Sequence, residues 1–337
     1  MQKRQTITDV ARKAAVSQGT VSRVINGYAV RPELKQRVIA AITELNYQPS
    51  VIAQSLRTNT TRTIGLIVTD ISNQVLAIIA KSAEEILRSA GYTLIVANSG
   101  DHPDREAELV RVLARRQVDG ILITVSDEDN PQMTEALKQV HLPIVLLDRY
   151  LPIEADLLHV DHGKGMYLAV KYLLNLGHQR IALITASPSI LPGRERIAGF
   201  KRAFEELNVA MNPDMVYSES LSATFGFQKA FALLNMANPP TAIIAGGNQI
   251  LEGVLEAIRI KEIAVPQNLS LIACDDTPLT RLTMPAITVV SRDLSAMGRM
   301  AATTLLDRIR SDTQPKPRHV ILPTELVLRA SCAPWGE

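Results

Sequence analysis

From residue 63 onward, short apolar segments alternate with amphipathic helical segments. Apolar runs such as TIGLIVTD (63–70) and DGILITV (119–125) flank helical patterns such as VLAIIAKSAEEILRSAG (75–91). The alternation then begins a second time, with RIALITA (180–186) and LSLIACDD (269–276) among its strands. Apolar strands separated by amphipathic helices are typical of parallel sheets covered on both faces. The sequence therefore predicts two similar α/β subdomains, and its 337 residues leave room for a further small domain.

Polar residues follow many of these predicted strands. In open α/β sheets, ligands bind beyond the carboxyl ends of the strands, so these residues are candidates for a ligand site. Asp, Asn and Arg suit a polyol, whose hydroxyl groups both donate and accept hydrogen bonds. For each residue taken alone, a helix cap or a surface ion pair is the better explanation, whereas the set taken together favours a small polar ligand. The strand-end residues are Asp70, Ser72, Asn73, Gln74, Thr124, Ser126, Asp148, Arg149, Arg196, Asn248, Gln249, Asp275, Asp276 and Arg292.

The charges are unevenly distributed along the chain. Residues 1–62 contain ten Lys or Arg and three Asp or Glu, whereas the remaining residues contain 26 basic and 31 acidic side chains. A small basic segment on a mildly acidic body favours contact with a polyanion such as nucleic acid. A solvated basic surface without a partner is the alternative.

The basic segment has the pattern of three short helices. Thr6 and Asp9 have the spacing of a capping box, Ser17 is placed to cap a second helix, and Asn26-Gly27 is a stop signal. Pro32 suits the start of a third helix. The residues expected to face the core of this segment are Val10, Ala11, Ala14, Val21, Val24, Ile25, Val38, Ile39, Ile42 and Leu45.

This arrangement is typical of a helix-turn-helix, because the second helix exposes small polar side chains and one arginine. Small side chains allow a recognition helix to approach the major groove closely, and hydroxyl groups hold phosphates. Gln pairs with adenine and Arg with guanine through two hydrogen bonds each, which makes Gln18 and Arg23 the candidates for base contacts. A small helical bundle or a protein-docking module is the alternative.

TITDVARKAAVSQGTVSRVING (6–27), followed by AAITELNYQPSVIAQSL (40–56), resembles the headpiece of the LacI/GalR family of bacterial transcriptional repressors. The T-x-x-D-V-A start, the V-S-x-x-T-V-S-R-V-x-N centre and the L-N-Y-x-P end all match, and the resemblance continues to about residue 330. In the family the two residues after V-S read bases. Gly19 has no side chain, so we expect Gln18 and Arg23 to make most of the contacts that read bases. The DNA-contact candidates of the headpiece are Thr6, Ser17, Gln18, Gly19, Thr20, Ser22, Arg23 and Asn26.

The following segment, PSVIAQSLRTNTTRT (49–63), corresponds in the family to a hinge helix. That helix folds where two copies meet on the minor groove. The resemblance implies that Leu56 wedges between base steps with Ala53 beside it, and a wedge of this kind kinks the duplex. Ser50 replaces the family's usual Asn, a conservative change at a helix cap. A plain interdomain linker is the alternative.

For the body, the resemblance implies a periplasmic-binding-protein-like clamp of two parallel-sheet α/β subdomains joined by three crossovers. The fold class is therefore α/β, with an N-terminal helix-turn-helix headpiece. The expected divisions are the headpiece at 1–49, the hinge and linker at 50–62, and the effector-binding and dimerisation domain at 63–337, with its N-subdomain at 63–161 and 292–321 and its C-subdomain at 162–291 and 322–337.

The family's motifs also imply an effector site. GRERIAGF places Arg196 at the arginine that grips the effector, ACDD places Asp275 at the effector-binding aspartate, and LPIVLLD places Asp148 at the pocket wall. VVSRD places Arg292 where some members have a ligand-contacting Gln. The implied effector-binding residues are Ser72, Asn73, Gln74, Thr124, Asp148, Arg196, Leu221, Asn248, Asp275 and Arg292.

Two departures from the family bear on the effector. Leu221 stands where several members have an aromatic lid, which weakens stacking unless Phe225 or Tyr150 substitutes, and Asn248 replaces the usual Asp. With three arginines nearby, the site favours a sugar acid or a sugar phosphate, since Arg pairs bidentately with carboxylate and phosphate. A nucleobase is the alternative effector. Ion pairs of Arg149 and Arg292 with Asp148 and Asp293 are the alternative explanation of the arginines.

Other functions have little support in the sequence. No nucleophile elbow, metal signature or glycine-rich phosphate loop of the known spacings is present, so neither an enzyme nor a cofactor is expected. The N-terminus lacks the apolar region of a secretory signal, and no apolar run is long enough to span a membrane, which favours the bacterial cytoplasm and the nucleoid. A solute-binding protein and an architectural DNA binder with a vestigial clamp are the remaining alternatives. A homodimer is expected to form through the N-subdomain, with ISNQVLAIIAKSAEEIL (71–87) as its interface helix unless that helix only packs on its own sheet.

Overall fold

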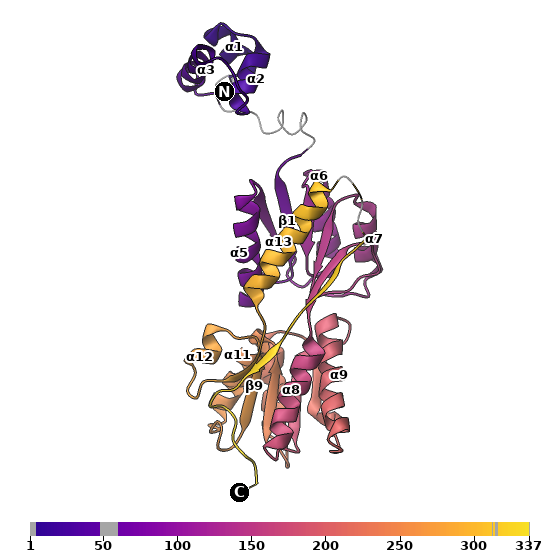
Figure 1. The fold of residues 1–337 in the computed structure, drawn as a ribbon. Helices are drawn as coiled ribbons and strands as arrows, with labels where there is room; N and C mark the ends of the chain where they lie inside the picture. The colour runs from indigo at the N-terminus through magenta and orange to yellow at the C-terminus, as the bar shows by residue number, and fades with distance from the viewer. Residues whose placement is uncertain (1–4, 48–59, 312, 314–315, 337) are drawn as a thin grey trace. The chain divides into compact units, whose positions relative to one another are not determined.

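A computed structural model describes residues 5–47, 60–311, 313 and 316–336. The chain divides into two compact units, Met1–Thr61 and Arg62–Glu337, and each is described by itself. Figure 1 shows the helices of the first unit and the two sheets of the second. The predicted hinge residues Ala53 and Leu56 lie outside the described residues.

The first unit consists of α1 (Ile7–Ala14), α2 (Gln18–Ile25) and α3 (Pro32–Glu44). Thr6 and Asp9 form the predicted capping box, and Ala15 ends α1 in the left-handed conformation with φ of 47°, so the chain turns sharply into α2. The three helices enclose a small core centred on Val10, Val21 and Val38. The expected helix-turn-helix is therefore present.

One core prediction for this unit is wrong. Ile39 is 48% exposed, and Ala41 is buried against α1 and α2 instead. In α3, Val38 and Ala41 are three residues apart and lie on one face, whereas Ile39 is rotated by about 100° from Val38. Apolar identity alone predicted Ile39 as a core residue, but the packing of three helices admits only a narrow stripe of α3.

The second unit contains two six-stranded sheets. The first, called here the N-sheet, has the order β11-β5-β4-β3-β1-β2, and all of its strands are parallel. Its two faces are covered by α5 with α13 and by α6 with α7. The elements are β1 (Thr63–Val68), α5 (Gln74–Ser89), β2 (Thr93–Asn98), α6 (Pro103–Arg115), β3 (Gly120–Ile123), α7 (Pro131–Gln139), β4 (Ile144–Leu147), β5 (Asp156–Val160), α13 (Leu294–Arg310) and β11 (His319–Leu322).

The second sheet, called here the C-sheet, has the order β12-β10-β9-β8-β6-β7 and is parallel except for β12. α10 and α11 cover one face and α8 and α9 the other. The elements are α8 (His162–Asn175), β6 (Ile181–Ala186), α9 (Leu191–Glu206), η1 (Pro213–Met215), β7 (Val216–Glu219), α10 (Ala223–Leu234), β8 (Ala242–Gly246), α11 (Asn248–Ile260), β9 (Ser270–Cys274), α12 (Pro278–Leu282), β10 (Thr288–Ser291) and β12 (Glu325–Val327).

The chain passes between the two sheets three times. It crosses after β5, after β10 and after β11, so each sheet contains strands from distant parts of the sequence (Figure 1). The predicted α/β clamp is therefore present. The carboxyl ends of the central strands of both sheets meet where the sheets approach each other, and the strand-end polar residues come together there.

Candidate functional site

The exposed surface of α2 carries the polar residues that the sequence predicted. Gln18, Gly19 and Arg23 are exposed, and Thr20 and Ser22 are half-buried. Ser17 caps the helix, since its Oγ accepts a hydrogen bond from the backbone N–H of Thr20 at 3.1 Å. A Cβ added to Gly19 would meet only Ser17 Oγ, at 3.6 Å, so no neighbouring side chain requires glycine at that position.

Two side chains of α2 are held in defined orientations. The Nε2 of Gln18 donates to Thr8 Oγ1 at 3.0 Å, which links the start of α2 to α1. An amide nitrogen has two hydrogens, so this bond leaves one N–H and the carbonyl oxygen of Gln18 available for a base edge. Asn26 turns back onto α2 and donates to Ser22 O. The exposed surface of α2 thus presents an oriented amide at its start and a basic side chain, Arg23, in its last turn.

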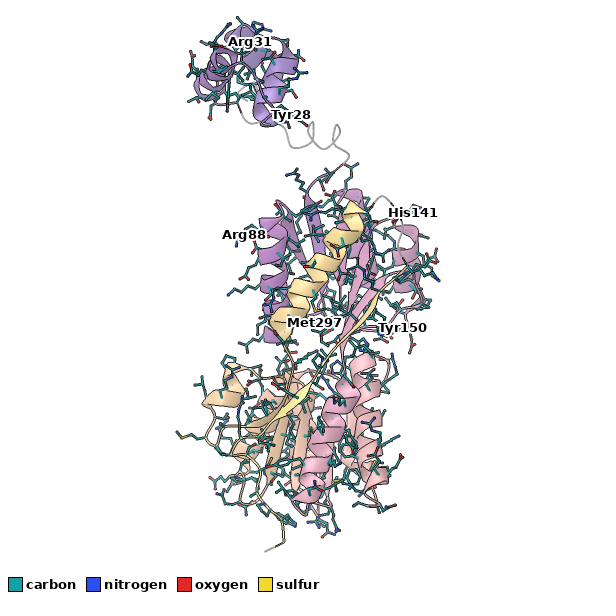
Figure 2. All side chains as sticks on the ribbon, viewed as in Figure 1. Tyr28, Arg31, Arg88, His141, Tyr150 and Met297 are labelled. Carbon is teal, nitrogen blue, oxygen red and sulfur yellow. The ribbon has the colours of Figure 1, made fainter. Side chains whose placement is uncertain are left out.

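In the second unit, a cavity lies between the N-sheet and the C-sheet. The space open to the centre of a water molecule is about 60 Å³, which holds several waters. Met297 of α13 forms part of the wall, and Figure 2 shows it where α13 faces the C-sheet. Eight of the ten predicted effector residues line this cavity: Asn73, Thr124, Asp148, Arg196, Leu221, Asn248, Asp275 and Arg292.

The other two predicted residues, Ser72 and Gln74, are exposed and do not line the cavity. Ser72 donates through its Oγ to Asp70 at 2.7 Å, and Gln74 is the first residue of α5. Asn73 lies between them, points inward and caps α5 through its Oδ1. Successive residues at a helix start face different directions, so only one of the three faces the cavity.

A buried ion-pair cluster occupies the centre of the cavity wall. Arg292 Nε donates to Asp275 Oδ1 at 2.6 Å, and Arg292 Nη1 pairs with Asp148 Oδ2. One guanidinium therefore bridges the strand ends of the two sheets. The alternative expectation was right that Arg292 is paired, but its partners are Asp148 and Asp275. Asp293 caps α13 instead.

His162 supports the same cluster from α8. Its Nε2 lies 3.2 Å from Asp148 Oδ1, and the ring is buried. Burial lowers the pKa of His162 to about 4 despite the nearby carboxylate, so the imidazole is neutral at pH 7 and donates to Asp148. Burial alone would raise the pKa of Asp148, but Arg292 and His162 outweigh it and hold that pKa well below its usual range.

The remaining two arginines of the cavity bind backbone carbonyls. Arg149 donates to Asp148 O at 2.7 Å and to Val125 O, and Arg196 Nη1 donates to Gly246 O at 2.6 Å. Arg149 thus lines the cavity, as its place at a strand end suggested, although the family motifs did not include it among the effector-binding residues.

The cavity lining contains no aromatic side chain. Leu221 lies at the expected wall position, but neither proposed substitute for the aromatic lid is there. Tyr150 is 55% exposed and, in Figure 2, lies at the side of the N-sheet, while Phe225 is buried in the core between the C-sheet and α10. The lining therefore offers hydrogen-bonding and charged groups but no aromatic ring for stacking.

Two sets of hydrogen bonds bridge the sheets beside the cavity. On one side, Gln249 donates to Asp70 Oδ2 at 2.7 Å and accepts from Asn73 Nδ2 at 3.1 Å. On the other side, Glu128 accepts from Arg194 Nη2 and from the backbone N–H of Leu191, each at 2.6 Å. Glu128 and Arg194 were not predicted from the sequence, because neither directly follows a predicted strand and their contact joins residues 66 positions apart.

In the part of the chain that the structure describes, no helix is long and apolar enough to cross a membrane. Nor does this part contain three or more His, Cys, Asp or Glu side chains grouped so that they could hold a metal ion.

A helix-turn-helix unit joined to a two-sheet ligand clamp defines a DNA-binding transcription regulator. Residues 6–50 match the family described as bacterial regulatory proteins, lacI family, and residues 170–332 match the periplasmic binding protein-like domain. The chain is 33% identical to the ribose operon repressor of Haemophilus influenzae over 97% of this chain and 98% of that protein. It is 34% identical to the transcriptional repressor PurR of Vibrio vulnificus, over 96% and 97%.

Among solved structures, the lac repressor dimer bound to operator and the anti-inducer ONPF superimposes with a TM-score of 0.86 at 27% identity, covering 98% of this chain and all of that one. The chain belongs to the lacI family of bacterial regulatory proteins. It is a DNA-binding transcriptional repressor and not an enzyme, as the sequence motifs indicated.

Proposed function

We propose that a small carbohydrate-derived effector binds in the cavity between the N-sheet and the C-sheet and thereby changes the affinity of this repressor for its operator. The observation that carries this proposal is that both sheets contribute residues to the cavity wall. Asn73, Thr124 and Asp148 come from the N-sheet side, and Arg196, Asn248 and Asp275 from the C-sheet side. A ligand that contacts both sides has a different affinity for each relative position of the sheets, and this difference is the basis of allosteric control.

The chemistry of the wall favours a polyol. Asn and Thr side chains both donate and accept hydrogen bonds, as sugar hydroxyl groups do. A nucleobase, the alternative effector, is favoured by an aromatic face, and the lining offers Leu221 instead. The name of the ribose operon repressor, a relative along nearly its whole length, agrees with a sugar-related role.

On DNA, we infer that α2 enters the major groove with Gln18 and Arg23 as its main base-reading residues. Ser17, Thr20 and Ser22 approach the phosphates, with Thr6, Gly19 and Asn26 close to the same surface. Ala53 and Leu56, which lie outside the described residues, are proposed to form the minor-groove wedge. These events take place at the nucleoid of a bacterial cell, where operators are found.

We also propose that the repressor acts as a homodimer on a pseudo-palindromic operator. A two-fold dimer presents two headpieces, which require two half-sites. The related lac repressor was solved as a dimer on its operator. The inner face of α5 packs on the N-sheet and α13, while its outer face carries exposed residues such as Gln74, Ala77 and Lys81, which leaves that face for a second copy.

Selection of operators from random DNA, followed by gel-shift titration, tests the DNA part of the proposal. Arg23→Ala is expected to relax the base preference at one position of each half-site. Lys13→Ala removes the same charge from α1, where it pairs with Glu44 at 2.5 Å, and is expected to leave the sequence preference unchanged. An unaltered preference in Arg23→Ala would refute the assignment of the reading helix.

Titration with effectors tests the cavity. Arg196→Ala is expected to abolish the change in operator affinity caused by an effector while sparing operator binding without it. A normal dose response in this variant would refute the position of the effector site. Leu56→Ala provides the opposite pattern, a loss of operator affinity with normal effector binding, and unchanged operator affinity would refute the minor-groove wedge.

A further inference from the structure

We propose that the effector carries an anionic group, a carboxylate or a phosphate, and that Arg149 together with Arg196 selects it. This inference rests on the proposed effector function of the cavity and narrows the effector from any polyol to a sugar acid or a sugar phosphate. Arg149 becomes the specificity-determining residue of the site.

The charged side chains of the cavity wall are paired unevenly. Three arginines and two aspartates line the cavity. Asp148 and Asp275 both bind Arg292, so this one guanidinium uses the two carboxylates of the lining. One positive charge against two negative charges leaves this cluster at −1, so together with Arg149 and Arg196 the lining carries a net charge of +1.

Neither of these two arginines has an ion-pair partner of its own. Within the described residues, no carboxylate oxygen lies within 4.0 Å of the guanidinium of Arg149 or Arg196. Their acceptors there are the backbone carbonyls of Val125 and Asp148 for Arg149, and that of Gly246 for Arg196. These neutral acceptors fix the guanidinium planes but supply no compensating charge.

Both arginines are buried, so the lack of a contacting carboxylate is unfavourable for the folded protein. Arg149 is 7% exposed and Arg196 is 4% exposed. The Nε of Arg196 is buried without a hydrogen-bond partner among the described residues, although the side chain lines the cavity. A buried charge that lacks a partner is strongly unfavourable, so an anion in this space satisfies a requirement of the protein itself.

The nearby acids outside the lining contact other groups. Glu106 accepts hydrogen bonds from Ser126 N at 3.0 Å and from Ser99 Oγ at 3.1 Å, and Glu128 pairs with Arg194. Burial lowers the pKa of Arg149 and the charge of Arg196 adds to the lowering, whereas Asp148, Glu128 and Glu106 oppose it from beyond ion-pair distance. A carboxylate or phosphate accepts hydrogen bonds from guanidinium groups in pairs, and Asn73, Asn248 and Thr124 remain for the hydroxyl groups of the same ligand.

Inorganic phosphate is the first probe, because it carries the anionic group without any sugar stereochemistry. We expect phosphate to raise the Tm of the full chain, and of Arg202→Gln, above the rise given by equal ionic strength of chloride. Arg202 is the matched control, since its replacement removes the same charge from the exposed side of α9, where it lies 3.8 Å from Glu206. In Arg149→Gln this rise should be lost, and in Arg149→Lys it should be retained in part. A phosphate effect that is absent, or equal in all four proteins, would overturn the proposal.

Calorimetry with matched ligands then identifies the source of the anion. Glucose, gluconate and glucose 6-phosphate form one set, and ribose, ribonate and ribose 5-phosphate form another. We expect an anionic member to bind roughly 10- to 100-fold more tightly than its neutral parent, and Arg149→Gln to remove that preference. A neutral sugar that binds as tightly as its acid and its phosphate overturns the anion proposal, even if it changes operator affinity. The proposed effector function fails separately, if a ligand that binds the cavity leaves operator affinity unchanged.

Discussion

Replacing Arg292 by Met removes the cation that holds two buried carboxylates together. Asp148 follows β4 of the N-sheet and Asp275 follows β9 of the C-sheet, and both bind this guanidinium. The side chains of all three residues are at most 11% exposed. Methionine fills a similar volume, so the change is chiefly electrostatic. It leaves two carboxylates facing each other in a poorly solvated space, with His162 as a neutral donor to Asp148.

The expected loss is large. Removing one partner of a buried ion pair costs about 3–5 kcal/mol. For a folded unit of this size, such a loss lowers the Tm by roughly 6–20 °C. Urea unfolding of the full chain without effector, followed by circular dichroism and by calorimetry, measures it. Arg299→Met is the matched control, because Arg299 is half-exposed and 3.8 Å from Asp293, and we expect it to cost no more than about 1 kcal/mol.

The pH dependence gives a second, sharper test. In the wild type the pKa of Asp148 is held well below its usual range, because Arg292 and His162 outweigh burial, so the stability it contributes is lost only as the pH falls below the pKa of the unfolded chain. Without Arg292, burial raises the pKa of Asp148, and protonation of this carboxyl removes the repulsion between the two buried carboxylates. The difference in stability between wild type and variant should therefore shrink from pH 7 to pH 4. A difference below 1 kcal/mol, or one that does not change with pH, would refute the reasoning.

Three further predictions follow from other contacts. Between pH 7 and pH 4.5, the His162→Gln variant should lose roughly 2–3 kcal/mol less stability than the wild type. The reason is that burial lowers the pKa of His162 to about 4, so the unfolded chain binds the proton more strongly than the folded chain does. Equal losses of stability in urea titrations of the two proteins would contradict this. Gln249→Leu removes the bridge to Asp70 and Asn73 and should raise the effector Kd by about five- to tenfold with operator affinity intact, as calorimetry and gel shifts can measure; an unchanged Kd would exclude a role in closing the cavity. Thr6→Ala should destabilise the headpiece by about 1 kcal/mol through loss of the capping box, whereas Thr6→Ser should not, and equal thermal midpoints for the two variants would argue against the cap.

The headpiece shows what a sequence can specify locally. The capping residues Thr6 and Ser17 and the helix start at Pro32 act within a few residues of their own position, and the structure has all three as predicted. Ile39 was mispredicted because its burial depends on how closely three helices approach one another, which no local pattern encodes.

The sequence also predicted most of the residues that line the cavity between the sheets. Parallel strands place their carboxyl ends at one edge of a sheet, so the alternation of strands and helices was enough to bring most strand-end residues to one place. It could not distinguish Asn73 from its neighbours Ser72 and Gln74, because their directions depend on the rotation of the first turn of α5.

By itself, the sequence determined the helix-turn-helix, the two α/β subdomains and the residue types that meet between them, since helix caps, apolar periodicity and the alternation of strands with helices are local features of the chain. Only the tertiary structure decided which charges neutralise one another. Arg292 pairs with Asp148, 144 residues away, and not with its neighbour Asp293, and this leaves Arg149 and Arg196 without carboxylate partners among the described residues. The physical reason is that an ion pair forms between groups that are close in space, and the three crossovers between the sheets set which distant residues those are.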